Sequence, residues 1–290
     1  MTVSHLDSAP VMPVSLFEAA EPASPLLFDS PHSGFDRPPD FRPAASEEQI
    51  RSTWDAYVDE LWADAPACGA TLITAHFSRA YIDANRAVDD IDPGLLAAPW
   101  PGALATTDYS HRGMGLIRRY ALPGVAMYDR LLNVAEVRAR IDCYYRPYRR
   151  LLHDTLDVLY ARHGTVWHFN CHSMKSRGND MNTDSGAARP DFVISDQLGR
   201  TADPALTQWV ADYFAGRGFS VKINDPYRGG NLVGTFGSPE RRRHSIQIEI
   251  NRALYMDEAA FARGPRFAEI RGELAGFVRA AAARSRAAVS

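Results

Sequence analysis

The sequence lacks the features that mark membrane, secreted and nucleic-acid-binding proteins. No apolar stretch approaches the roughly 18 uncharged residues that a membrane span needs, and the segment MTVSHLDSAP lacks the pattern of a secretory signal. The formal net charge is −3, and the 32 Lys and Arg residues are spread along the chain, so no basic field for nucleic acid is present. We therefore expect a cytoplasmic protein that binds neither nucleic acid nor a membrane. Its oligomeric state stays open.

Cysteine is scarce, and several common catalytic motifs are missing. The three cysteines, Cys68, Cys143 and Cys171, have no CxxC spacing, which favours buried thiols in a reducing compartment. There is no GxSxG elbow, P-loop or GxGxxG sequence, so serine hydrolases, NTPases and dinucleotide-binding enzymes have no support. The chain also has no internal repeats and no low-complexity linker.

The composition is that of a globular protein, with 46% hydrophobic and 23% charged residues in 290. We expect strands at 25–29, 70–75, 78–83, 165–171, 191–195, 219–223 and 245–250, and helices at 46–66, 130–163, 203–216 and 257–285. This alternation predicts an α/β fold with a mixed, mostly parallel sheet and helices on both faces. We expect a single domain at 25–290, after an N-terminal arm at 1–24.

Two long stretches carry no clear helix or strand pattern. They cover 87–128 and 172–190, and the second is polar and rich in glycine. Irregular segments of this length in a compact domain are usually functional or mobile. Closure of these loops over a substrate is a hypothesis that the sequence leaves open.

Two histidines follow the ends of expected strands. His32 lies just past the first strand in LLFDSPHSG, and His172 lies at the end of VWHFNCHSM. A single histidine is more often structural than a metal ligand. Two at the same edge of a sheet can converge, and catalytic zinc needs three protein ligands and an open position. The pair therefore raises the possibility of a metal site.

The third ligand would be a carboxylate or another histidine. Asp55 and Asp59 are spaced i,i+4 on the helix expected at 46–66, so they share one face. Both aspartates are candidates from this segment, although for Asp59 an ordinary exposed acidic stripe is the better interpretation.

The segment HFSRAYIDANR places Arg79 and Arg86 on either side of Asp83 and Asn85. Arginine binds carboxylates in bidentate fashion, so one of the two could hold a substrate carboxylate with help from the Asn85 amide. Alternatively, Asp83 pairs with one of the arginines and only fixes a turn. Both interpretations stay open.

Glu249 stands between Ile248 and Ile250 in HSIQIEINR. On an interior strand this carboxylate would need a partner or a function, and burial would raise its pKa toward that of a general base. On an edge strand it would simply face solvent. In the preceding loop, NDPYRGGN, the two glycines and Arg228 suit a backbone that passes close to a ligand.

Together, these residues supply what metal-assisted hydrolysis of a small anionic substrate requires. A metal lowers the pKa of its water, a glutamate takes the proton, and an arginine neutralises the developing oxyanion.

The motifs SPHSG, SRAYIDANR, NCHSM, NDPYRGG and QIEINRALYMDE occur in this order. Together they resemble the N-formylglutamate amidohydrolase (N-formylglutamate deformylase) family over about residues 25–260. The resemblance implies an α/β fold related to zinc carboxypeptidases. It also implies hydrolysis of N-formyl-L-glutamate to formate and L-glutamate, the last step of one histidine-degradation route. Two alternatives are a deacylase for another N-acyl amino acid and a metal-dependent binding protein without catalysis.

The resemblance also implies roles for individual residues. It assigns His32 and His172 to the metal, Glu249 to the general base, Arg79 to polarising the carbonyl, and Asn85 and Arg86 to a substrate carboxylate. Arg228 is a candidate for the second carboxylate. For the remaining ligand, similarity to the family pattern D-x-Y-V-D-E-L favours Asp55, with Asp36 as the alternative. Zinc is the expected metal, and another divalent ion would also suit these ligands.

Overall fold

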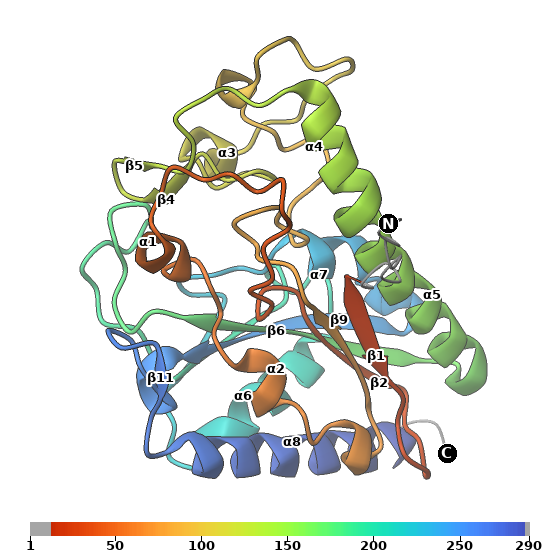
Figure 1. Ribbon diagram of the computed structural model, residues 1–290. Helices are drawn as coiled ribbons and strands as arrows, with labels where there is room; N and C mark the ends of the chain where they lie inside the picture. Colours follow the sequence, from red (N-terminus) through yellow and green to blue (C-terminus); the bar gives the residue numbers. More distant parts are fainter. Residues whose placement is uncertain (1–12, 288–290) are drawn as a thin grey trace, which may run out of the picture.

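The computed structural model describes residues 13–287, and its centre is a seven-stranded sheet with the order β1-β3-β2-β6-β9-β7-β8 (Figure 1). The strands are β1 (Val14–Phe17), β2 (Leu26–Ser30), β3 (Thr71–Ala75), β6 (Val166–Met174), β7 (Phe192–Ser195), β8 (Val221–Ile223) and β9 (Arg243–Asn251). Strands β3, β2, β6 and β9 are parallel, whereas β1 is antiparallel to β3 and β7 to β9. The expected mixed, mostly parallel α/β sheet is confirmed.

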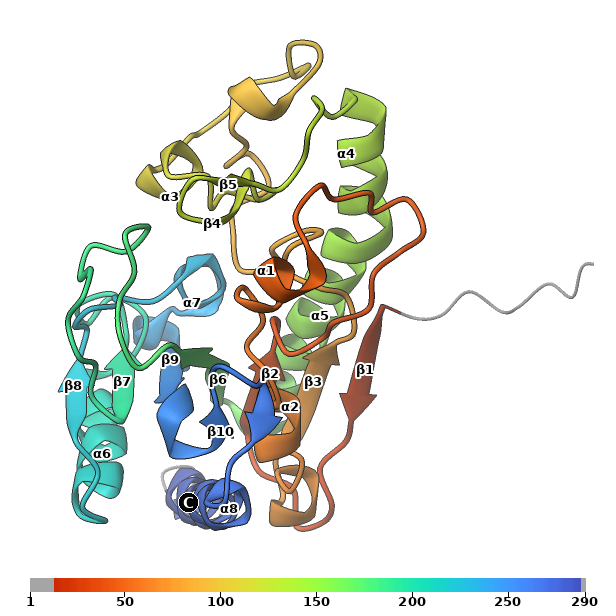
Figure 2. The same ribbon diagram turned by 60° about the vertical axis from the view of Figure 1, so that its left-hand side comes forward.

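Helices cover both faces of this sheet (Figures 1 and 2). They are α1 (Glu47–Arg51), α2 (Val58–Leu61), α3 (Asp108–His111), α4 (Val134–Arg140), α5 (Arg146–His163), α6 (Pro204–Ala215), α7 (Asn231–Phe236) and α8 (Phe267–Ala287). Phe28 and Ile248 belong to the hydrophobic cluster under α2, α6 and α8, whereas Leu27 and Ile73 belong to the cluster on the α5 side. Side chains of β2 thus alternate between two cores.

Shorter elements connect these layers. They are two hairpins, β4–β5 (Tyr120–Leu122 and Val125–Ala126) and β10–β11 (Met256–Asp257 and Ala262–Arg263), and the short helical turns η1 (Pro66–Cys68), η2 (Pro93–Leu95), η3 (Ile141–Tyr145), η4 (Pro239–Arg241) and η5 (Arg252–Leu254). The π-helical turn η3 joins α4 to α5, so the helix expected at 130–163 exists as one continuous helical segment that begins at Val134. Pro147 follows this turn and has no N–H to donate, which suits a local change of helical register.

The strand expected at 78–83 is wrong, and the helix expected at 257–285 starts later than predicted. Residues 78–83 form a tight buried turn, in which the N–H of Tyr81 donates to Ser78 O, instead of a strand. Burial at 80–85 is continuous, so the polar-apolar alternation of this segment did not reflect a pleat. Helix α8 begins at Phe267, because the β10–β11 hairpin occupies the first residues of the helix expected at 257–285.

The helix expected at 46–66 is broken in the middle, and the break positions Asp55. Helix α1 starts as predicted at Ser46, which forms a capping box with Gln49. The chain then leaves the helix, and Tyr57 adopts a left-handed conformation with φ 64° before α2 begins. In this break the N–H of Asp55 donates to His32 O at 3.2 Å, which fixes the two residues next to each other.

The two long irregular segments lie beyond the carboxyl ends of the parallel strands (Figure 2). The first contains α3 and the β4–β5 hairpin, while the second starts at Lys175 because β6 runs to Met174. Arg112 Nη1 donates to Met181 O at 3.3 Å and joins the two segments. Both therefore stand over the same edge of the sheet.

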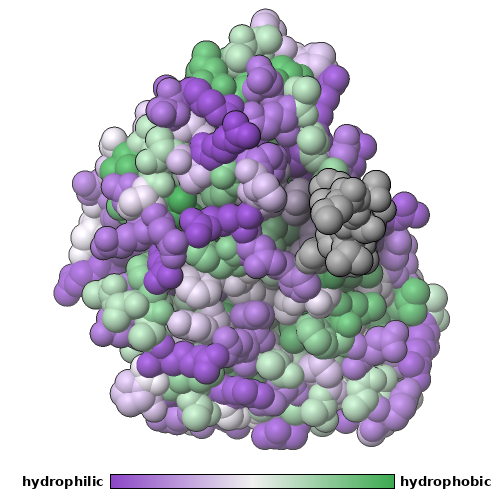
Figure 3. All heavy atoms as spheres, viewed as in Figure 1, coloured by the Kyte–Doolittle hydropathy of each residue, from purple (hydrophilic) through white to green (hydrophobic). Residues whose placement is uncertain are grey.

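The remaining expectations concern the chain's N-terminal part and its surface. Residues 1–12 of the arm expected at 1–24, which include the segment MTVSHLDSAP, lie outside the described residues. Strand β1, which also belongs to this arm, pairs with β3 at the edge of the sheet. The division at residue 24 stays a prediction. Within 13–287, no helix is both long and apolar enough to span a membrane. The face in Figure 3 is mostly hydrophilic, with small, separate hydrophobic areas.

Candidate metal and catalytic site

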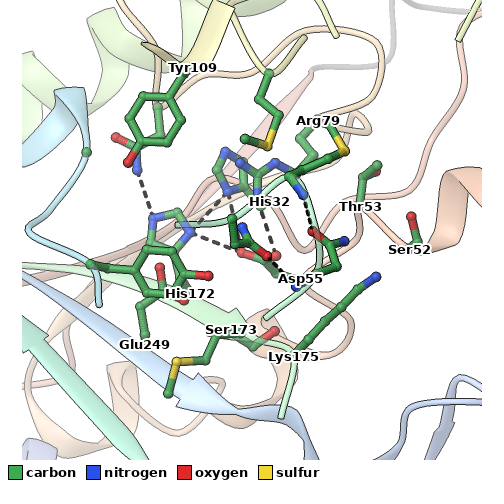
Figure 4. Close-up of a pocket in the computed structure, with 18 of the residues that line it drawn as sticks. His32, Ser52, Thr53, Asp55, Arg79, Tyr109, His172, Ser173, Lys175 and Glu249 are labelled. Atoms are coloured by element: carbon green, nitrogen blue, oxygen red, sulfur yellow. Dashed lines mark hydrogen bonds and ion pairs between the residues drawn. The ribbon is translucent and has the colours of Figure 1, made fainter. Parts of the chain in front are cut away.

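Three of the predicted residues converge at the carboxyl end of the sheet. His32 follows β2, Asp55 lies in the break between α1 and α2, and His172 lies near the end of β6. The Nδ1 atoms of the two histidines are 3.0 Å apart, and Asp55 Oδ2 lies 3.0 Å from His172 Nδ1 and 3.4 Å from His32 Nδ1. All three side chains are buried, and Figure 4 shows them facing one another.

The outer nitrogens of both histidines already have acceptors. His32 Nε2 lies 2.7 Å from Asp83 Oδ1, and His172 Nε2 lies 2.7 Å from Asn170 Oδ1. The amide orientation of Asn170 is set by its Nδ2, which donates to Asp29 Oδ1 at 2.8 Å. The Asp83 carboxylate can only accept from His32, and Asn170 Oδ1 can only accept from His172. With these partners the proton of each ring is assigned to Nε2, although the Asn85 Nδ2 amide also lies 3.0 Å from His172 Nε2. Each Nδ1 therefore presents a lone pair to the space beside Asp55.

This donor set fits a divalent metal ion. Two neutral imidazole nitrogens and one carboxylate are typical zinc ligands, and tetrahedral ligands on ~2.0–2.1 Å bonds lie about 3.3 Å apart. The three ligand atoms lie within 4.8 Å of one another. The carboxylate-histidine contact of Asp83 with His32 is the support that metal-binding histidines usually have. The residues present could thus hold the zinc ion that the sequence predicts.

The surroundings of Asp55 and Asp83 lower the pKa of both carboxyl groups, so both are ionised. Burial alone would raise the pKa of Asp55, but its contacts with His172 and His32 and the charge of Arg79 outweigh this effect and hold the pKa well below its usual range. Burial would also raise the pKa of Asp83, and the charge of Arg79 is the main factor that keeps it low. The Asp55 carboxylate is therefore ionised before any cation binds, as a metal ligand must be.

Glu249 occupies the neighbouring strand, directly beside His172. The two residues are register partners on β9 and β6, so the side chain of Glu249 points toward the same edge. It lines the pocket, is 8% exposed, and accepts a hydrogen bond from Gln247 Nε2 at 2.9 Å. Burial raises its pKa, although His172 offsets part of this effect. The interior position that the sequence left open is confirmed, and an edge strand is excluded.

Arg79, Asn85 and Arg86 also line this pocket. Arg79 Nη2 donates to Asp83 at 2.7 Å, and its Nη1 lies 3.5 Å from Asp55 Oδ1. The Asn85 amide is occupied, since its Oδ1 accepts from Leu232 N at 2.8 Å. Arg86 stacks on Tyr109 with its guanidinium carbon 3.9 Å from the ring centre. Asp83 is thus both an ion-pair partner of Arg79, as one interpretation had it, and the support of His32.

Two candidates lie elsewhere. Arg228 is exposed and does not line the pocket, so the geometry gives it no contact with a ligand there. Gly230, two residues further along, does line the pocket and lies against Asn85, where an added Cβ would be 2.4 Å from Asn85 Nδ2. Asp36 is also exposed, and its backbone N–H bonds to His76 O, away from the histidine pair. The geometry therefore favours Asp55 over Asp36 as the third metal ligand.

Sequence reasoning missed several basic residues of this pocket. Arg252 Nη2 pairs with Asp55 Oδ1 at 3.0 Å, and it follows the same strand as Glu249. Arg118 and Lys175 come from the two irregular segments. Arg118 stands in the apolar context LIRRY, the same kind of signal that singled out Glu249. Lys175 had no comparable signal.

Comparison with known proteins identifies the relatives of this chain. A model of the family described as N-formylglutamate amidohydrolase matches residues 24–256. The chain belongs to the N-formylglutamate amidohydrolase family. It is accordingly an enzyme of the class that hydrolyses linear amides.

Individual members of the N-formylglutamate amidohydrolase family are similar over most of the chain. The N-formylglutamate deformylase of Pseudomonas aeruginosa is 30% identical over 238 residues, which cover 81% of this chain and 84% of that protein. The enzyme of the same name from Pseudomonas putida is 28% identical, with 81% and 82% covered. The crystal structure of an N-formylglutamate amidohydrolase from Ralstonia eutropha has a TM-score of 0.90 at 39% identity, covering 96% of this chain and 100% of that one.

Proposed function

We propose that the protein hydrolyses N-formyl-L-glutamate to formate and L-glutamate, with a zinc ion held by His32, Asp55 and His172. Its relatives carry the name of this activity. The observation that carries the proposal is the convergence of two Nδ1 lone pairs and a carboxylate beside the buried Glu249. A place in histidine degradation is the corresponding metabolic role.

When bound, a zinc ion would lower the pKa of a coordinated water and polarise the formyl carbonyl. Glu249 accepts the proton of the attacking water and returns it to the leaving amine nitrogen. Its position beside His172 and its hydrogen bond from Gln247 orient the carboxylate for this transfer.

The arginines of the pocket act on negative charge. Arg79 is fixed by Asp83 and lies beside Asp55, so its guanidinium stabilises the charge that develops on the carbonyl oxygen. Arg86 has no carboxylate partner within the described residues and binds the α-carboxylate. Asn85, whose amide is used internally, holds the Gly230–Leu232 turn against the pocket.

The test is release of formate from N-formyl-L-glutamate. Protein stripped by a chelator should be inactive, and zinc should restore the activity. N-acetyl-L-glutamate on the same samples distinguishes a broader deacylase, because a larger acyl group should be rejected by a site built for formyl. Folded protein that releases no formate with zinc, cobalt, manganese or iron would refute the proposal.

A further inference from the structure

The pocket contains more positive charge than its own carboxylates neutralise. Two acidic side chains, Asp55 and Glu249, face six basic ones, which are Arg79, Arg86, Arg118, Lys175, Arg189 and Arg252. Three of the six have carboxylate partners: Arg79 pairs with Asp83, Arg189 with Asp184, and Arg252 with Asp55. Arg86 is stacked on Tyr109 and bonded to a backbone carbonyl. Arg118 and Lys175 remain.

Arg118 is a buried guanidinium without a partner. Its side chain is 7% exposed, and within 13–287 it makes no ion pair or hydrogen bond; its Nε is buried and unsatisfied. A buried charge that lacks a counter-ion is costly, so such a group is retained where a ligand supplies the opposite charge. Burial and the positive charges of Arg79 and Arg86 lower the pKa of Arg118 to about 9. An anion in the pocket would relieve this repulsion.

Lys175 lies close enough to Arg118 to feel its charge. Burial lowers the pKa of Lys175 to about 8; the charges of Arg252 and Arg118 add to this effect, and the charge of Glu258 offsets part of it. No ion pair or hydrogen bond of its ammonium is present within the described part of the chain. In Figure 4 the side chain extends from the end of β6 away from His172. Each of the two long segments thus delivers one unpaired cation to the same cavity.

We propose that Arg118 and Lys175 together bind the side-chain carboxylate of the substrate and make the enzyme selective for N-formyl amino acids with an acidic side chain. This inference rests on the proposed function for the identity of the acyl group. Arg86 is left to the α-carboxylate, and the pair replaces Arg228, which is exposed and outside the pocket. Selectivity then resides in the loops, whereas His172 and Glu249 reside on strands of the sheet and His32 directly follows one.

The test compares N-formyl-L-glutamate with N-formyl-L-glutamine, which has the same shape but a neutral side chain. In the wild type, kcat/KM should be far higher for the glutamate compound. Arg118→Gln should lower kcat/KM for N-formylglutamate by about 30- to 3,000-fold, as expected for removal of one partner of a buried charge pair. Lys175→Met should lower it by about tenfold. For N-formylglutamine both variants should change kcat/KM far less, and the loss should be mainly in KM.

Control variants distinguish the loss of a positive charge in the pocket from a general effect on folding. Arg150→Gln changes an arginine whose side chain is 85% exposed on α5, and Lys222→Met changes the only other lysine, on β8; both should match the wild type. Arg118→Lys keeps a charge and should recover part of the preference. If Arg118→Gln does not fold, Lys175→Met and Arg118→Lys decide the matter. Equal losses on both substrates in these variants overturn the inference.

Binding of L-glutamate provides a readout that is independent of turnover. Because the chain has only two lysines, Lys175 and Lys222, ¹³C-methylation of the amines gives two lysine signals for NMR. L-glutamate should shift the Lys175 signal and leave the Lys222 signal in place, and L-glutamine should shift neither signal. This result without formate release would retain the carboxylate site and refute only the proposed reaction. Formate release with an unmoved Lys175 signal would retain the reaction and refute the site.

Discussion

Two buried histidine-carboxylate clusters lie near strands β2 and β6, one between the strands and one at their carboxyl ends, and they have opposite chemical consequences. In the inner cluster, His168 of β6 lies 2.8 Å from Asp29 of β2 and 2.7 Å from Ser245 Oγ, and Tyr148 donates to the second oxygen of Asp29 at 2.5 Å. Every nitrogen and oxygen of this set has a protein partner.

The outer cluster, His32, Asp55 and His172, has the same residue types and similar burial. Here the outer nitrogens are bonded and the inner ones converge with a carboxylate. What distinguishes a structural cluster from a candidate metal site is therefore the lone pairs that remain after the internal hydrogen bonds are assigned.

The largest difference should appear when one histidine of each cluster is replaced by alanine. His172→Ala removes a ligand, so bound zinc and formate release should both fall to background. His168→Ala should destabilise the fold by about 3–5 kcal/mol, because Asp29 keeps a buried charge without its partner, while the folded fraction still binds zinc. Elemental analysis and urea unfolding measure the two outcomes. Loss of zinc in His168→Ala with full binding in His172→Ala would reverse the assignment.

Glu249→Gln should give the next largest effect. The amide keeps the shape and the contact with Gln247 but cannot accept the proton of water, so kcat should fall by about 10²–10⁴-fold. Zinc content and the unfolding midpoint should stay near those of the wild type. Activity within a few fold of the wild type would remove Glu249 from the mechanism.

Asp83→Asn should weaken the outer cluster without dismantling it. Asp83 accepts from His32 Nε2, and such supports typically contribute 10–100-fold to metal affinity. Competition with a fluorescent chelator measures the change. Asp154→Asn, in which the replaced side chain is 60% exposed, is the matched control and should bind zinc as the wild type does.

A smaller, pH-dependent effect should come from Lys175. Its amine has a pKa lowered to about 8, so its charge is present below pH 8 and is lost as the pH rises through this value. If it binds the substrate carboxylate, the affinity for L-glutamate should fall by about tenfold between pH 7 and 9. Calorimetry on wild type and Lys175→Arg checks this, since arginine stays charged across the range. Identical pH profiles would exclude Lys175 from binding.

The sequence was sufficient for the sheet and for the strand-end histidines, because parallel strands and their polar ends leave local patterns. It failed at 78–83, where alternation arose from a buried turn whose contacts come from distant residues, such as Leu116 O on Asp83 N. The break that places Asp55 was also not visible, since it depends on the left-handed Tyr57 and on the His32 carbonyl.

The residues proposed to bind the substrate's side-chain carboxylate were the hardest to predict. Arg228 was chosen for its place in a glycine-rich loop, but the loop directs Gly230 inward and Arg228 outward. Arg118 and Lys175 lie in irregular segments, where no periodicity links a residue to a face. Their common location depends on how two loops pack against each other, which local patterns do not encode.

The most direct test of the central claim is anomalous diffraction at the zinc edge from crystals of the zinc-loaded protein. The account predicts one strong peak, from a zinc ion coordinated by His32 Nδ1, His172 Nδ1 and Asp55, and no peak at His168. A peak elsewhere, or none at this cluster in protein that binds zinc in solution, would contradict the assignment of the outer cluster as the metal centre.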